Sequence, residues 1–242
     1  MQAAEILEDT ASARTAPAHQ RMRGVAEVAL AQRRGGTRLT GLAQSGAAKA
    51  MLPRVHAADP EIVLLNTAGG LTGGDRLRYA LSLDEGARAV ATTQTAERAY
   101  RSLPDLPPAR LDVEINVGAR GHLSWLPQET ILFDGAALHR RTRIVLAEGA
   151  RCLAGVSGVR GRVAMGETVT QLEFRDWREI RRAGAPVYLD PFALGRADLA
   201  RRDGLATLGG ARAIASVVFV GPGAEDRLEH VRCLTDRAGD GV

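Results

Sequence analysis

The chain has 242 residues, 45% of them hydrophobic, and a formal net charge of +4. This length is enough to bury a substantial core. No apolar run approaches the roughly 20 residues needed to span a bilayer, and the N-terminus lacks the basic-then-apolar order of a signal peptide. Cys152 and Cys233 are far apart and fit a reducing compartment without a disulfide framework. We therefore expect a cytoplasmic protein with no membrane partner.

The positive charge does not predict nucleic-acid binding. Almost all the basic residues are arginines, and they are scattered along the chain rather than clustered among aromatic residues. A nucleic-acid interface would concentrate them on one segment with aromatic side chains between. An arginine-rich surface that meets an acidic protein partner fits this pattern better.

Residues 1–20 are polar and are expected to form a disordered tail, and residues 21–242 are expected to form a single domain. Residues 62–65 are strand-like. Apolar residues then occupy every second position from Leu111 to Val117, and a shorter alternation runs from Val169 to Phe174. Period-two alternation predicts half-buried strands. The β-branched run from Arg212 to Val220 predicts a more deeply buried strand.

The tripeptide Gly-Ala-Arg recurs between apolar segments, at 86–88, 118–120, 149–151 and 210–212. The first three copies are about 31 residues apart, and the last follows at about twice that distance. A glycine turn at a fixed period predicts hairpins or arcs stacked in a regular β layer. The alternative is chance, because Gly, Ala and Arg are abundant in this chain.

Helix signals are few. The clearest runs from Gly223 to Ala238, with acidic residues in its first turn, arginines toward its end and Gly239 at the C-cap position. A shorter candidate covers Thr95 to Ser102. The predicted fold is mainly β, a layered or β-helix-like stack of short strands with one or two α-helices near the C-terminal end.

The stretch from Asn66 to Asp75 (NTAGGLTGGD) contains two glycine pairs. One interpretation is a phosphate-binding loop at the glycine-rich turn 69–74, which would make the protein a binding protein or an enzyme for a phosphorylated ligand. However, the stretch has no Lys or Arg and no Gly-Lys-Ser/Thr sequence leading into a helix. A rigid compound turn beside a contact surface is the favoured interpretation.

No catalytic motif is evident. The serine in 155–158 lacks the spacing of a nucleophile elbow, and the five histidines form no zinc-binding motif. His230 and Cys233 could share a helix face, but two ligands do not make a site. We therefore expect no enzymatic activity, no catalytic residue and no tightly bound cofactor.

Three segments together are similar to the urease accessory protein UreD (UreH) family. Residues 64–75 (LLNTAGGLTGGD) resemble its hallmark without a mismatch, and residues 92–102 and 126–136 resemble two further family motifs. Residues 161–167 give a weaker match. The resemblance covers roughly residues 20 to 220.

The resemblance implies a mostly β, layered or β-helical fold and a non-enzymatic role in urease maturation. It implies a complex with UreF and UreG that docks on apo-urease and assists nickel insertion, with nickel in transit through an internal passage. Acidic residues within the matched motifs are the candidates for lining that passage: Asp75, Glu97, Glu129, Asp134 and Glu167. Family members usually continue beyond the end of this chain with a helical stretch, so we expect a truncated or divergent C-terminal part here.

Overall fold

The computed structural model describes residues 20–54, 57–162, 165–204 and 206–239, without the side chains of 235–239. The N-terminal tail expected at residues 1–20 lies almost entirely outside the described residues. Within them, no helix combines the length and the apolar character that a membrane crossing requires.

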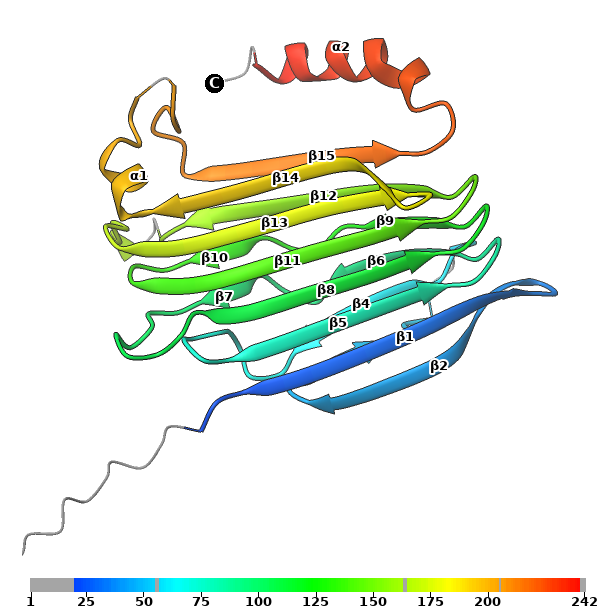
Figure 1. Cartoon of the computed structure of the whole chain (residues 1–242), viewed down its shortest axis with the longest axis horizontal. Coiled ribbons are helices and arrows are strands. Elements are labelled where there is room, and N and C mark those ends of the chain that lie inside the picture. The colour runs from blue at the N-terminus through cyan, green and yellow to red at the C-terminus, as the bar shows by residue number, and fades with distance from the viewer. Residues whose placement is uncertain (1–19, 55–56, 163–164, 205, 240–242) are drawn as a thin grey trace, which may run out of the picture.

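Two β-sheets face each other as layers (Figure 1). The first sheet has the order β14-β13-β11-β8-β5-β1-β2. Its strands are β1 (Arg23–Arg33), β2 (Gly36–Gly46), β5 (Arg76–Leu83), β8 (Ala109–Val117), β11 (Ala136–Leu146), β13 (Leu172–Arg182) and β14 (Ala185–Gly195). The pairs from β1 through β5, β8 and β11 to β13 are parallel, and only the outer pairs β1–β2 and β13–β14 are antiparallel.

The second sheet has the order β3-β4-β6-β9-β12-β10-β7, and β15 pairs with β12. Its strands are β3 (Ala48–Met51), β4 (Glu61–Asn66), β6 (Arg88–Thr93), β7 (Glu97–Ala99), β9 (His122–Trp125), β10 (Thr130–Leu132), β12 (Arg151–Arg160) and β15 (Ala213–Val220). Helix α1 (Arg196–Ala200) follows β14, and a 3-10 turn (Glu225–Arg227) leads into helix α2 (Leu228–Gly239). The prediction of a mainly β fold with one or two late helices is confirmed.

The Gly-Ala-Arg turns join the two sheets. The first three connect β5 to β6, β8 to β9 and β11 to β12, and the fourth directly precedes β15. The first three stack on one another, since the amide of Gly86 donates to Ala119 O and the amide of Arg120 donates to Glu148 O. Each of these three turns therefore ends one arc of a stacked coil, and for them the repeat is structural and forms arcs rather than hairpins. The fourth copy lies at the opposite end of the stack, because β15 runs antiparallel to β12 and begins beside Val159.

The core lies between the sheets and consists mainly of Leu, Ile, Val and Ala. In β8 the buried positions include Leu111, Val113, Ile115 and Val117, as the alternation predicted. The second alternation lies only partly in a strand, because β13 begins at Leu172. Leu172 and Phe174 are buried, but so is Val169, which the alternation places on the opposite face. With few aromatic side chains available, the layers are held by small aliphatic residues.

Two sequence predictions were wrong. Residues 95–102 form no helix; this segment contains β7, which is held between Leu71 on one side and β10 on the other. The run from Arg212 to Val220 is a strand but not a deeply buried one. It pairs only with β12, and Val217 on its outer face is 72% exposed. In both cases tertiary pairing, rather than local propensity, decides the outcome.

Candidate functional site

The matched motifs meet at one end of the stacked arcs, opposite the first three Gly-Ala-Arg turns. At this end β7 pairs with β10 and Leu71 bridges to Ala99. The turn 66–75, the segment 94–107 and the connection 126–135 therefore lie on successive coils, beside the short strands β7 and β10 in Figure 1. Segments that are about 30 residues apart in sequence thus form one surface.

The glycines of the first motif allow this close stacking. A Cβ on Gly70 would lie 2.4 Å from Tyr100 Cε2, and a Cβ on Gly73 would lie 2.0 Å from Ser102 Oγ. Tyr100 in turn packs edge-on against Phe133 of the third motif, with ring centroids 5.0 Å apart. The three motifs therefore depend on one another sterically.

Asp75 is buried and holds the glycine-rich turn closed. Its Oδ2 accepts the amide of Thr72 at 2.9 Å, and its Oδ1 accepts the amide of Met22 at 2.9 Å. Both carboxylate oxygens are thus used by backbone donors. This geometry makes Asp75 a structural residue of the turn rather than a residue that lines a passage.

Asp134 and Glu167 act in the same way on neighbouring coils. Asp134 Oδ1 accepts the amides of Thr170 and Gln171 at 2.8 and 2.9 Å, and these hydrogen bonds lower the pKa of Asp134. The pKa of Glu167 is also lowered. Desolvation raises this pKa, but the hydrogen bonds from Arg162 and from the Asp134 amide outweigh that effect. Both carboxylates therefore join the ends of coils through hydrogen bonds.

Glu97 differs from the other candidates because it lines cavities that lead between the sheets. Among the side chains that the structure describes, the one that hydrogen-bonds the Glu97 carboxylate is Asn66, whose Nδ2 lies 3.1 and 3.3 Å from the two carboxylate oxygens. Desolvation raises the pKa of Glu97 to about 7, although the hydrogen bond from Asn66 lowers it in part. On the next coil, the backbone oxygen of Glu129 accepts the amide of Glu97, and the Glu129 side chain makes no hydrogen bond with the described residues.

Two cavities meet at Glu97. The first, of about 70 Å³, is lined in part by the exposed residues Gly69, Gln94 and Thr95, so it reaches the surface. The second, of about 30 Å³, lies between the sheets and includes Trp125 and Thr130. The residues common to both linings are Tyr79, Thr93 and Glu97. Glu97 thus stands where a surface cavity adjoins the interior.

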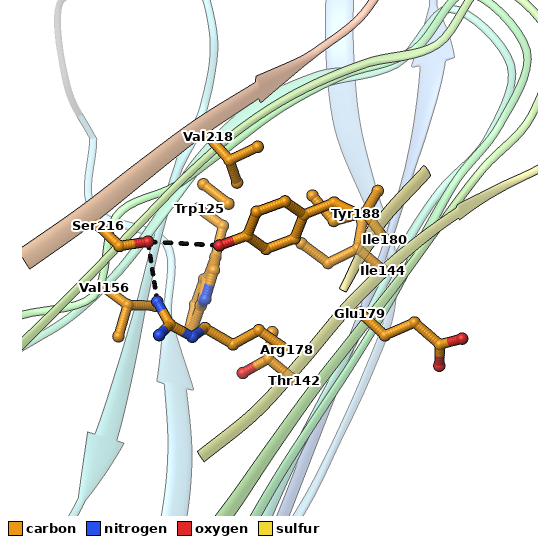
Figure 2. A pocket seen from close by; sticks show the side chains of 11 residues that line it. Trp125, Thr142, Ile144, Val156, Arg178, Glu179, Ile180, Tyr188, Ser216 and Val218 are labelled. Carbon is orange, nitrogen blue, oxygen red and sulfur yellow. Dashed lines mark hydrogen bonds between the residues drawn. The ribbon is translucent and has the colours of Figure 1, made fainter. Parts of the chain in front are cut away.

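Beyond the second cavity the interior contains a buried ion-pair network. Arg140 donates to both carboxylate oxygens of Asp176, at 2.9 and 2.7 Å, and to Thr130 Oγ1 at 2.8 Å. Arg178 donates to Asp190 Oδ2 at 2.9 Å. Figure 2 shows the next cavity, of about 20 Å³, where hydrogen bonds join the Arg178 and Tyr188 side chains to Ser216. Shared lining residues make these cavities a row between the layers.

Sequence reasoning missed this network, although a signal was present. Asp176 continues the inward phase of Leu172 and Phe174, and Arg140 continues the inward phase of Leu138 in β11. The two residues are register partners across β11 and β13. A charged residue at an inward position of an alternating strand therefore marks a buried pair.

The glycine-rich turn is not arranged as a phosphate cradle. The amides of Gly69, Leu71, Thr72, Gly74 and Asp75 all donate to protein acceptors. A phosphate loop instead leaves its backbone N–H groups free for the ligand. In the described part of the chain, no three His, Cys, Asp or Glu side chains form a group that could hold a metal ion.

Two substitutions of Asp75 distinguish the effect of its shape on the stability of the turn from the effect of its charge. We expect Asp75→Asn to lower the free energy of unfolding by about 1 kcal/mol, because the amide can keep one of the two backbone hydrogen bonds. Asp75→Ala should cost about 2–3 kcal/mol, since both buried N–H donors then lose their acceptor. Urea denaturation of the two variants measures this order, and equal losses would contradict the assigned role.

These features define a two-layered parallel β scaffold with a row of internal cavities and one end built from interdependent turns. The family described as UreD urease accessory protein matches residues 22–242. The chain belongs to this family.

Curated relatives cover most of the chain. A urease accessory protein UreD from Cereibacter sphaeroides (strain ATCC 17025) is 56% identical over 220 residues, which are 91% of this chain and 79% of the relative. One from Paracoccus denitrificans is 50% identical over 91% of this chain and 77% of the relative. One from Chelativorans sp. is 40% identical over 94% of this chain and 82% of the relative.

Proposed function

We propose that this chain is a scaffold for urease maturation that assembles with UreF and UreG, docks on apo-urease and passes nickel through its interior to the urease site. It has no catalytic turnover in this proposal, and nickel is cargo rather than a resident cofactor. Membership of the urease accessory family supports the general role. The observation that carries the passage is the position of Glu97 between a surface cavity and the interior row.

The chemistry of Glu97 suits a transit point. Carboxylate, amide and hydroxyl oxygens are ligands for hard and borderline cations, and the cavities at Glu97 also contain the side chains of Asn66 and Thr93. A single carboxylate with neutral oxygens holds a divalent ion more weakly than a full ligand set. With a pKa of about 7, Glu97 can also exchange the ion for a proton at neutral pH. Both properties favour release.

The other candidate acids have different places in this proposal. The carboxylates of Asp75, Asp134 and Glu167 already accept hydrogen bonds from backbone amides. A cation would have to displace those donors, and the turns would then lose the hydrogen bonds that keep them closed. Glu129 lies one coil from Glu97 and is a second, weaker candidate for the mouth of the passage.

The test is nickel loading of urease in cells that contain every accessory gene, with nickel limiting. We expect Glu97→Gln to lower urease nickel content and ureolysis about tenfold, because the amide keeps the shape but not the charge. Glu114→Gln is the matched control, since Glu114 is exposed on the outer face of β8 and pairs with Arg78. Normal activation by Glu97→Gln at low nickel, with normal assembly, would contradict the passage.

A pH titration gives a readout of Glu97 that does not depend on urease. The folded pKa of about 7 lies above the ordinary value of 4.5, so the native state binds this proton more tightly than the unfolded state. The stability due to Glu97 is fully present below pH 4.5 and is lost as pH rises through 7. Wild type should therefore lose stability relative to Glu97→Gln over this range, and parallel stability curves would refute the shift.

A phosphorylated ligand at the glycine-rich turn is the alternative function. The turn offers few free amides, as described above, and contains no cationic side chain. The maturation role is therefore preferred.

A further inference from the structure

A polar cleft of about 180 Å³ is lined by three arginines, two of which, Arg160 and Arg212, also line a cavity of the interior row. Arg160 ends β12, Arg202 follows α1, and Arg212 directly precedes β15. The amide of Arg160 donates to the backbone oxygen of Arg212 at 2.9 Å, which fixes these two residues side by side. The fold therefore brings together three cations from segments up to 52 residues apart in sequence.

The three guanidinium groups have few partners within the protein. Nε of Arg160 is buried and has no hydrogen-bond partner among the described residues, whereas Nη2 of the same guanidinium donates to the backbone oxygen of Ala211. Arg212 forms no ion pair or hydrogen bond through its side chain with the described residues. Arg202 donates to the backbone oxygen of Leu199 at 3.4 Å and reaches the Asp203 carboxylate at 3.9 Å. Buried donors are normally satisfied, so the Arg160 Nε is a donor left available to an acceptor in the polar cleft.

The charges at this cleft do not balance. Glu167 also lines it, but its carboxylate is held by Arg162 at 3.0 Å. Asp203 is the remaining acid, and its side chain is 83% exposed. Three guanidiniums against one free carboxylate leave a net charge of two. Burial and then the charges of Arg202 and Arg212 lower the pKa of Arg160, which is the expected sign of this repulsion.

We infer that this cleft, formed by Arg160, Arg202 and Arg212, binds a phosphate group. A dianion matches the net charge. Guanidinium groups match phosphate oxygens in bidentate geometry, and three of them can serve a tetrahedral oxyanion better than a planar carboxylate. The exposed Thr168, also in the lining, adds a hydroxyl donor. Phosphate chemistry is thus assigned to the arginine cleft and not to the glycine-rich turn.

The phosphate group can come from inorganic phosphate or from the terminal phosphate of a nucleotide. Isothermal titration of the full chain with sodium phosphate, and separately with a nucleoside triphosphate, distinguishes these sources. We expect saturable binding of phosphate that sodium chloride and sodium acetate do not reproduce at the same ionic strength. A nucleotide that binds tenfold or more tightly than phosphate, at the same arginines, would identify the nucleotide as the source; equal affinity would identify free phosphate.

The decisive variant is Arg212→Gln, because Arg212 is exposed and its loss leaves the fold intact, which circular dichroism checks. We expect the affinity for phosphate to fall at least about tenfold, as for the loss of a charge-assisted hydrogen bond. Arg110→Gln, an exposed arginine of β8, removes the same charge elsewhere and should leave the affinity unchanged. Equal binding of acetate and phosphate, unchanged affinity in Arg212→Gln, or equal losses in both variants would overturn the assignment.

Discussion

Asp176→Ala is expected to lower the free energy of unfolding by about 3–5 kcal/mol, because it leaves buried cations without their counter-charge. The Asp176 side chain is 2% exposed, and the Arg140 side chain that donates to both of its oxygens is 8% exposed. Arg178 Nε also lies 3.2 Å from Asp176 Oδ2. Urea denaturation should show a lower midpoint with an unchanged slope.

Glu27→Ala is the control for this prediction. Glu27 forms an ion pair with Arg78 at 2.6 Å, but both side chains are more than a third exposed. Removal of this exposed pair should cost about 1 kcal/mol or less. If the two variants lose similar stability, burial does not govern the Arg140–Asp176 pair.

The same pair can be tested by replacing both partners. Arg140→Met combined with Asp176→Leu puts apolar side chains of comparable size between β11 and β13, and it should recover most of the stability that Asp176→Ala loses. Poor recovery would show that shape, and not the unpaired charge, dominates the single variant. Recovery would also show that fold stability does not require ions inside the layers, so their presence reflects another constraint on the interior.

Local sequence patterns predicted the elements that depend on local burial. The alternation from Leu111 to Val117 predicted β8 because one face of that strand packs on the core. The Gly-Ala-Arg copies predicted the arcs, since a turn repeated at every coil must recur in sequence. Glu225 and Asp226 marked the start of the helical segment, although they lie in the 3-10 turn that leads into α2.

Prediction failed where pairing between distant segments decides the structure. Residues 95–102 have no strand pattern of their own, and β7 forms only because Leu71 and β10 lie on either side of it. The candidate acids were chosen because they lie in the matched motifs, and the sequence does not show what their side chains contact. Their roles separate only when the fold shows that Asp75 meets backbone amides whereas Glu97 meets a cavity.

Gly70→Ala is expected to cost about 3 kcal/mol or more, the largest effect of any single methyl group at the motif end. Gly70 has a φ of 155°, which residues with a side chain rarely adopt. A Cβ there would also lie 2.7 Å from Arg98 O, and that oxygen accepts the amide of Leu71 at 2.7 Å. The backbone therefore cannot give way without opening the contact between the first two motifs.

Gly69→Ala is the matched control for Gly70→Ala. Gly69 also has a positive φ, 77°, but a Cβ at Gly69 would have no neighbour within 4 Å. Its left-handed conformation alone should cost about 1–2 kcal/mol. The difference between the two alanine variants in urea denaturation thus measures the close approach of the coils. A difference below about 0.5 kcal/mol, within the usual effect of a surface substitution, would show that the coils can separate at no cost.

Adding Tyr100→Ala to Gly70→Ala divides the clash into two parts. The Tyr100 ring is the nearest atom group to the new methyl, and it is held by Phe133 and by the hydrogen bond of its hydroxyl to Gly69 O at 3.3 Å. In the double variant the side-chain clash disappears, whereas the clash with Arg98 O and the strained φ remain. We therefore expect the Gly70 methyl to cost less in the Tyr100→Ala background than in wild type, but still more than the methyl at Gly69. An unchanged cost would place the whole effect in the backbone, and the steric coupling between the first two motifs would then run through Arg98 instead of Tyr100.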